Sequence, residues 1–370
     1  MLSTHAEDRA RLVELEIQVR DLERVLTALR LEESATRERL DAYKYPVLTL
    51  PNEIVAEIFL HFLPRYPVCP PLTGPNSPIL LTHICPLWRE IALATPQLWR
   101  AVSLSGRWSP FEANKIWVSR AGCCPLAIRM NGRDAHALNG TELIAAVLPY
   151  RTRCQYLELR LCHNADTLLT MEGEFPLLRH FDLEIDSLPS RDIQFQNLDV
   201  PMLRSVVLDG WAAQWIILPW TQLTILCLHG TTLEDYERIL RQASNLLECY
   251  LSIVDVDDID EDSIIDPPIT LAHLQSLKVD VESSMPRFLD SFILPALCSL
   301  EVDESLLRDD MISSLTSFIA RSGCKLKNLC ITYGVLDSYS YSLAVPSIQE
   351  VNVLFDPGPD RWPIHLLSYS

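Results

Sequence analysis

Glycine is scarce in this chain, with 11 residues among 370. The glycine-rich motifs that hold phosphates or shape a catalytic turn are also missing: there is no Gly-x-Gly-x-x-Gly fingerprint, no Walker loop and no Gly-x-Ser-x-Gly elbow. Nucleotide-binding and hydrolase chemistry therefore have no support in the sequence. No His-Glu-x-x-His motif occurs either, and the nine histidines are scattered. We expect a protein that is not an enzyme and that uses no cofactor and no metal ion.

Long apolar runs, an excess of basic residues and closely spaced cysteine pairs are missing as well. No segment approaches the ~18 uncharged apolar residues of a membrane span, and the N-terminus lacks the apolar region of a secretory signal. The net charge of −18 argues against nucleic-acid binding, which needs clustered positive charge. The eleven cysteines include no Cys-x-x-Cys pair, so no zinc site or disulfide framework is indicated. We expect an intracellular protein, cytoplasmic or nuclear, that binds neither membranes nor nucleic acid.

Residues 1–45 are predicted to form an amphipathic or coiled-coil helix. Within 5–42, apolar residues recur at alternating steps of three and four, with charged residues between them: Leu12, Leu15, Val19, Leu22, Leu26 and Leu29. This 3.5-residue repeat places one apolar seam along a helix, where it is best buried against another helix. The repeat weakens at Glu33 and Thr36, which take the next two core positions. Two interpretations remain open: self-association with a second copy, and packing against the same chain.

Residues 46–105 contain ten prolines separated by short helical patterns. Pro51 suits the first turn of a helix, and the residues after it form one apolar face at helical spacing: Ile54, Val55, Ile58, Phe59 and Phe62. The proline-rich segment 64–78 is predicted to be a loop. A second helix is expected from about residue 79 to 94, with Ile84, Trp88, Ile91 and Ala92 facing inward. Pro86 would cost that helix ~3 kcal/mol unless the helix breaks there.

The same segment resembles an F-box. Members of that family share a Leu-Pro-x-Glu start, an Ile-Phe pair, a Cys-x-x-Trp and a closing Leu-Trp. This sequence has all four in that order: Leu50-Pro51-Asn52-Glu53, Ile58-Phe59, Cys85-x-x-Trp88 and Leu98-Trp99. The surrounding sequence is most similar to the F-box proteins that are abundant in mushroom-forming fungi. The resemblance implies a small helical unit over residues 46–105 that docks on the Skp-type adaptor of a cullin–RING ubiquitin ligase.

An exposed apolar surface is also expected from the size of this unit. About 60 residues cannot bury all of the large apolar side chains present, and an exposed apolar patch usually marks an interface. Trp88 and Trp99 fit equally well as the core that orients this surface. The adaptor-binding residues that the resemblance implies are Leu50, Pro51, Ile54, Ile58, Phe59, Cys85, Trp88, Leu98 and Trp99.

Residues 106–370 contain a recurring pattern of three apolar positions in the spacing apolar-x-x-apolar-x-apolar. Nine instances run from Cys154-Leu157-Leu159 to Ile348-Val351-Val353, with successive starts 20 to 29 residues apart, and weaker forms begin at Trp99 and Cys123. The alternation at the end of each unit predicts a strand with one buried face. The pattern resembles irregular leucine-rich repeats, although the asparagine that normally follows the strand is missing. The resemblance implies an α/β fold, a solenoid with a parallel sheet.

Helical signals separate some of the predicted strands. Thr231 and Glu234 have the spacing of a capping box. Residues 306–322 are predicted to be a helix that ends at Gly323.

Two features invite a search for ligands. Seven acidic residues lie within 255–266, and their spacing fails the EF-hand pattern because Ser263 and Ile269 replace the required Gly and Glu. We interpret this run as a solvated loop, with a basic partner segment as the functional alternative. His163, His180 and His229 lie at or near the ends of predicted strands, and we interpret them as polar residues at turns.

The leading hypothesis is a substrate receptor of a Skp–cullin–F-box type ubiquitin ligase. The F-box-like helices would bind the adaptor, and the repeats would bind a protein target of unknown identity. The alternative is a non-catalytic interaction scaffold in which the F-box-like helices cap the open end of the solenoid. A third hypothesis, an enzyme of unidentified type, would need a deep pocket with convergent titratable groups.

Overall fold

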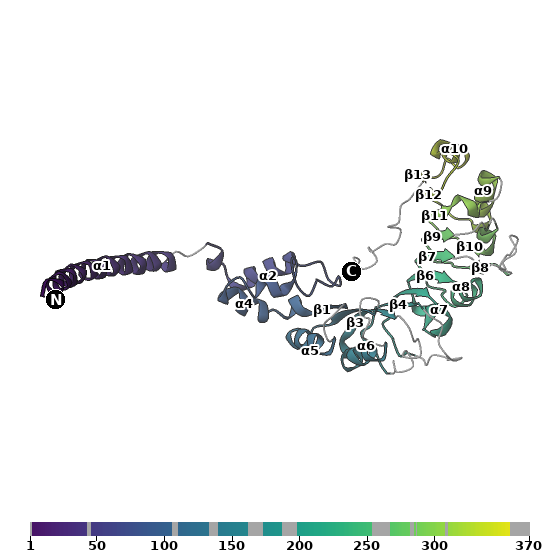
Figure 1. Cartoon of the computed structure of the whole chain (residues 1–370). Helices are drawn as coiled ribbons and strands as arrows, with labels where there is room; N and C mark the ends of the chain where they lie inside the picture. Colours follow the sequence, from purple (N-terminus) through teal and green to yellow (C-terminus); the bar gives the residue numbers. More distant parts are fainter. Residues whose placement is uncertain are drawn as a thin grey trace. The chain divides into compact units, whose positions relative to one another are not determined.

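The computed structural model describes residues 2–42, 46–105, 110–132, 140–161, 173–186, 198–253, 267–281, 285, 287–307 and 310–355. The fold is mixed α/β, with a long N-terminal helix and a parallel sheet of 11 strands (Figure 1). The chain divides into two compact units, residues 1–57 and 58–370, and the division falls within helix α2 (Asn52–Phe62).

The first unit contains helix α1 (Leu2–Ala42) and the short 3-10 helix η1 (Pro46–Thr49). Helix α1 confirms the helix predicted within residues 5–42. The helix is continuous because this stretch contains neither glycine nor proline to interrupt it. Every side chain from residue 5 to residue 42 is exposed. Ion pairs one turn apart support the helix: Arg11–Glu14 at 2.8 Å, Arg24–Asp21 at 3.1 Å and Arg37–Glu33 at 3.6 Å.

The second predicted helix of the F-box-like segment is two helices, α3 (Pro78–Leu81) and α4 (Pro86–Leu93). Pro86 takes the first position of α4, where its missing N–H breaks no helical hydrogen bond. Cys85 precedes it as the N-cap, and its Sγ accepts a hydrogen bond from the Trp88 amide at 3.5 Å. The expected continuous helix over 79–94 was therefore wrong, because Pro86 starts a new helix. The 3-10 helix η2 (Pro96–Trp99) follows.

All 11 strands of the large sheet are parallel, and their order in the sheet follows the chain. Figure 1 shows this succession, with α8 and α9 on the same side of the strands. The strands are β1 (Ala101–Ser105), β2 (Leu126–Asn131), β3 (Cys154–Leu161), β4 (His180–Ile185), β5 (Ser205–Gly210), β6 (Ile225–Thr231), β7 (Glu248–Ile253), β9 (Ser276–Val281), β11 (Ser299–Asp303), β12 (Asn328–Thr332) and β13 (Glu350–Leu354).

Shorter elements connect these strands. Strands β8 (Ile269–Thr270) and β10 (Phe292–Ile293) form a separate two-stranded parallel sheet. The helices are α5 (Pro110–Arg120), α6 (Gly140–Val147), α7 (Ala212–Trp215), α8 (Leu233–Leu240), α9 (Met311–Ser322) and α10 (Ser338–Ala344), with 3-10 helices η3 (Leu148–Arg153), η5 (Trp220–Gln222), η6 (Phe288–Ser291) and η7 (Glu304–Leu306).

The strand register follows the apolar pattern of the sequence. Leu157 of β3 pairs with Phe181 of β4, and equivalent apolar positions pair at each neighbouring strand as far as Val351 of β13. One expectation was wrong: the weak instance that begins at Cys123 is out of register by two residues. Ile128 pairs with both Val102 and Leu157, so Ile128 and Met130 take the repeating positions of β2.

The two faces of the sheet differ in burial. The repeating apolar side chains are buried, as in β9 and β11, whereas residues between them are half-exposed. Helix α8 packs on the buried side, where the Tyr236 hydroxyl donates to the Ser252 carbonyl at 2.5 Å. The opposite side, which we call the open face, carries the polar residues of the strands.

Two helix boundaries differ from their sequence signals. Thr231 is the last residue of β6 and pairs with Ile253, so the N-cap of α8 is Thr232, whose hydroxyl accepts from the Asp235 amide at 3.3 Å. Helix α9 begins at Met311 rather than at residue 306, because Asp310 caps it. Its predicted end is confirmed: Gly323 has a φ of 65°, which a residue without Cβ adopts readily.

Candidate functional site

Helix α2 exposes a strip of apolar side chains. Ile54 is 49% exposed and Ile58 is 47% exposed, whereas Val55 and Phe59 are 2% and 1% exposed. Residues four apart lie on one face of a helix, so Ile54 and Ile58 form one exposed face and Val55 and Phe59 the buried one. Leu50 and Pro51 are also exposed just before the helix. We call Leu50, Pro51, Ile54 and Ile58 the α2 strip.

The other motif residues lie at least partly inside the protein. Phe59 contacts the edge of Trp88, with ring centroids 5.0 Å apart, and Leu98 is 1% exposed. Trp99 is fully buried, and its indole N–H donates to the Ala92 carbonyl at 2.9 Å. Cys85 and Trp88 are half-buried. Phe59, Leu98 and Trp99 are therefore buried in the structure, where they pack within the helical segment and lie outside the exposed strip.

Two apolar residues near the helix break are exposed, and one of them, Ile84, differs from the sequence analysis. Ile84, expected to face inward, is 54% exposed because it lies between α3 and α4 rather than on one helix face. Leu80 on α3 is 42% exposed. The inward positions expected for Ile91 and Ala92 are confirmed, since both are buried.

A tryptophan pair joins the F-box-like segment to the sheet. The rings of Trp99 and Trp117 meet edge to face with centroids 5.2 Å apart. The Trp117 indole donates to the Ala101 carbonyl of β1 at 3.1 Å, and the Arg120 guanidinium lies 4.4 Å from the Trp99 ring centroid. Helix α5 therefore holds η2 against the first strand.

The proline-rich loop 64–78 packs on the first strands of the sheet. The Tyr66 hydroxyl donates to Gln155 at 2.9 Å, and its ring meets Tyr156 edge to face with centroids 5.4 Å apart. The Arg100 guanidinium lies 3.9 Å from the centre of the Tyr66 ring. Burial raises the pKa of the Tyr66 hydroxyl well above its ordinary value, so Tyr66 stays neutral. The sequence identified the loop but not where it packs.

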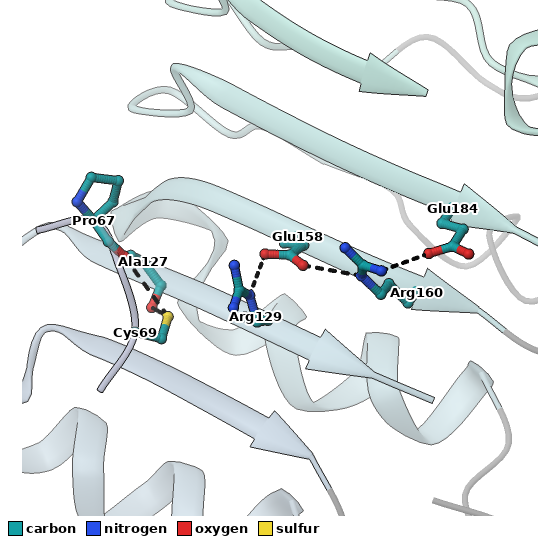
Figure 2. A network of polar contacts seen from close by, with 7 residues as sticks. All are labelled: Pro67, Cys69, Ala127, Arg129, Glu158, Arg160 and Glu184. Atoms are coloured by element: carbon teal, nitrogen blue, oxygen red, sulfur yellow. Dashed lines mark hydrogen bonds and ion pairs between the residues drawn. The ribbon is translucent and has the colours of Figure 1, made fainter. Parts of the chain in front are cut away.

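Charged side chains form a chain of ion pairs across strands β2, β3 and β4 on the open face. Glu158 accepts from Arg129 and, at 3.1 Å, from Arg160. Arg160 in turn lies 3.2 Å from Glu184 (Figure 2). Both carboxylates are largely buried, with side chains 11% and 7% exposed. Two arginines thus compensate two buried acids, and we call these four residues the ladder.

Asp182 lies next to the ladder in the strand register, paired with Glu158. Burial first, and then the charge of Glu158, raise the pKa of Asp182 to about 7, with Arg160 acting in the opposite direction. On strand β5, Val207 pairs in register with Asp182. Asp209 of the same strand lies 2.7 Å from the Nδ1 atom of His229 on β6. The open face therefore contains more acidic than basic groups over β3 to β6.

A shallow pocket lies between loop 64–78 and the ladder. Its lining includes Cys69, Arg129, Glu158 and His180, and Figure 2 shows Cys69 beside the Ala127 carbonyl of β2. Burial raises the pKa of Cys69 to about 12, so its thiol stays protonated at neutral pH and is a poor nucleophile.

His180 in the same pocket is neutral at pH 7. Burial lowers its pKa to about 4, and its Nδ1 is 2.9 Å from the Ser205 hydroxyl. His180 begins β4, and His229 lies within β6. The thiol is therefore a poor nucleophile, and the lowered pKa makes the neutral imidazole a weak base.

Other predicted features fall outside the described residues. His163 and all of the acidic run 255–266 lie there, as does Cys162. Among the residues that the structure does describe, no cluster of three His, Cys, Asp or Glu side chains could hold a metal ion. No described helix has the length and apolar character needed to span a membrane.

Comparison with known proteins leaves the family open. No family model matches the chain, and a search of curated proteins finds no match to it.

Proposed function

We propose that this chain is a substrate receptor of a Skp–cullin–F-box type ubiquitin ligase. The observation that carries the proposal is the exposed α2 strip, which follows the Leu-Pro-x-Glu start of the F-box-like motif. In this proposal the α2 strip binds the Skp-type adaptor, the strands and helices beyond residue 105 bind a protein target, and the chain performs no chemistry itself.

The α2 strip has the chemistry of a docking surface. Ile54 and Ile58 are each nearly half-exposed, and full burial of such a side chain contributes about 1.5–3 kcal/mol. The opposite face of α2 is held by Phe59 against Trp88, so the strip is presented by a helix with a fixed inner side. An exposed apolar strip on a supported helix is typical of a helix-mediated interface.

The sheet supports the second half of the proposal. Strands recur at the spacing of leucine-rich repeats and keep one register from β3 to β13. We therefore propose an irregular leucine-rich-repeat solenoid. Its open face would bind the target, because that face carries the half-exposed polar side chains.

Adaptor capture tests the proposal. Purified full-length chain and an Ile54→Ala/Ile58→Ala variant are incubated with a purified Skp-type adaptor, and affinity is measured by titration. We expect the double substitution to weaken binding about 100-fold, since each truncation removes about 1–2 kcal/mol of apolar burial. Both side chains are exposed, so the fold should be unaffected, which circular dichroism checks.

The matched control replaces two apolar residues away from the strip that are at least as exposed as Ile54 and Ile58. Ile116→Ala/Leu343→Ala alters side chains that are 52% and 71% exposed on α5 and α10, and its affinity should equal that of the wild type. If the wild-type chain and both variants recover only background amounts of adaptor, the ligase proposal is wrong.

A second function is favoured by the tryptophan pair. Trp99 and Trp117 join the F-box-like segment to β1, as expected if these helices cap the end of the solenoid in a non-catalytic interaction scaffold. Capping would use Trp99 and Trp117, whereas adaptor binding would use the α2 strip. A failure of adaptor capture would therefore not contradict the scaffold function.

A further inference from the structure

Helix α1 presents an apolar seam along a continuous helix. Its six seam side chains are 42% to 68% exposed: Leu12, Leu15, Val19, Leu22, Leu26 and Leu29. A helix of 41 residues is about 60 Å long, so the seam runs along a rod rather than a short patch. In coiled coils an apolar seam of this kind is buried against another helix, so a seam left exposed in the single chain indicates an interface.

The seam residues occupy the core positions of three heptads. Taking Leu12 as position a places Val19 and Leu26 at a as well, and places leucine at every d position of the seam. Leucine at d with a β-branched residue at a favours two strands over three or four, and Val19 provides this combination at one of the three a positions. The next core positions are Glu33 and Thr36, so the favourable packing ends after Leu29.

The residues beside the seam determine the orientation of a second helix. In a parallel pair in register, each g position meets the e position five residues further along the other helix. Arg11 then meets Glu16 of the second copy, and Glu32 meets Arg37 of the second copy. The remaining pairs, Gln18 with Glu23 and Val25 with Arg30, contain at most one charge each. Both charged g–e pairs in this arrangement are attractive, and the like charges of the two Glu33 side chains meet only beyond the core.

An antiparallel pair has less favourable charges. If the same six seam residues are matched, with Leu12 opposite Leu29 of the second copy, equivalent e positions face each other. Glu16 then meets Glu23, and Arg9 meets Arg30. These e contacts bring like charges together, and symmetry repeats each of them. The g positions face each other as well, and there Arg11 meets Glu32 in an attractive contact. The antiparallel pair therefore has two kinds of repulsive contact and one attractive, whereas the parallel pair has two attractive ones. Charge complementarity therefore selects the parallel arrangement.

We propose that α1 binds α1 of a second copy of this chain as a parallel, in-register, two-stranded coiled coil with a core from Leu12 to Leu29. The ion pairs within the single helix, Arg11–Glu14 and Arg37–Glu33, are exposed. Exposed pairs of this kind contribute little, so the arginines can exchange them for partners on the second helix. The proposal holds whether or not the chain binds an adaptor.

The first experiment measures the mass of the full-length chain by sedimentation equilibrium over a range of concentrations. We expect the mass to rise from 42.1 kDa to twice that value as concentration increases. A Leu15→Lys/Leu22→Lys variant should remain at the single-chain mass. The control Ile17→Lys/Leu31→Lys alters side chains of the same helix that are 49% and 68% exposed but lie off the seam, and it should associate like the wild type.

The second experiment tests the orientation by charge reversal. In the parallel arrangement, Glu16→Arg places two arginines opposite each other and should weaken association about tenfold. The double variant Arg11→Glu/Glu16→Arg restores opposite charges and should recover wild-type association. In the antiparallel arrangement Glu16→Arg would instead relieve a repulsion and strengthen association.

Four results would overturn the proposal. The single-chain mass at every concentration would exclude self-association, and equal behaviour of the seam and off-seam variants would exclude the seam. A limiting mass of three chains, or tighter association of Glu16→Arg, would exclude the two-stranded parallel arrangement.

Discussion

Asp182 shows how a single residue on the open face can limit the stability of the fold. Its carboxyl is largely removed from water and pairs in register with Glu158, so burial and a like charge both disfavour ionisation. Glu158 itself is compensated by Arg129 and Arg160. The pKa of Asp182 is instead raised to about 7.

The raised pKa predicts a loss of stability as pH increases. Between the unfolded value near 4 and the folded value of about 7, the folded state binds a proton that the unfolded state has released. The free energy of unfolding therefore falls as pH rises through this range. Asp182→Asn removes the effect: at pH 8 the variant should be more stable by about 1–3 kcal/mol, and at pH 4 equal to the wild type.

Urea denaturation at pH 4, 6 and 8 measures this difference. Asp199→Asn is the control, because Asp199 is an exposed aspartate of the same unit, and its substitution should change stability by less than about 0.5 kcal/mol at each pH. A gain for Asp182→Asn that is the same at all three pH values would show that ionisation of Asp182 is not the cause.

At the scale of elements, proline determines where the helices of the F-box-like segment begin. Pro78, Pro86 and Pro96 each take a first helical position, and the carbonyl of Pro51 accepts from the amides of the first turn of α2. A proline in a first position needs no N–H and already has a helical φ. The segment is therefore several short helices rather than two longer ones.

Proline substitution tests this account of α4. Pro86→Ala should lower the free energy of unfolding by no more than ~1 kcal/mol, through the greater freedom of the unfolded chain. Glu90→Pro, at an exposed position inside the same helix, should lower it by ~3 kcal/mol because a helical hydrogen bond is lost. Chemical denaturation of both variants gives the comparison. A gain of several kcal/mol in Pro86→Ala would mean that Pro86 strains the helix.

At the scale of the whole molecule, the F-box-like segment supplies the first strand of the sheet. Strand β1 pairs with β2 along five positions, and Trp99 packs beside it against Trp117. Residues 58–105 belong to the same compact unit as the sheet. The unit therefore depends on residues that the sequence motif alone assigns to adaptor binding.

Two internal deletions test this dependence. Deleting residues 46–105 removes β1, uncovers the edge of β2 and exposes the buried Trp117, so we expect loss of cooperative thermal unfolding and aggregation. Deleting residues 2–42 removes only exposed side chains among those described, and the melting temperature at low protein concentration should stay within a few degrees of the wild type. Unchanged melting after the 46–105 deletion would rule out the capping function.

The sequence alone determined the features that depend on neighbours along the chain. The absence of glycine and proline before residue 43 determined α1, and the spacing of apolar residues such as Leu157 and Leu159 determined both the strands and their register. Gly323 marked the end of α9 for the same reason. These signals succeed because helix propensity, capping and strand alternation act over a few residues.

Only the tertiary structure decided which motif residues are exposed and which polar residues meet. Ile54 and Phe59 are both apolar residues of one helix, yet one faces solvent and the other packs on Trp88. Tyr66 binds Gln155, 89 residues away, and the ladder joins three separate strands. Burial and charge pairing depend on contacts between distant parts of the chain. A local sequence pattern does not specify which distant residue will contact a given side chain.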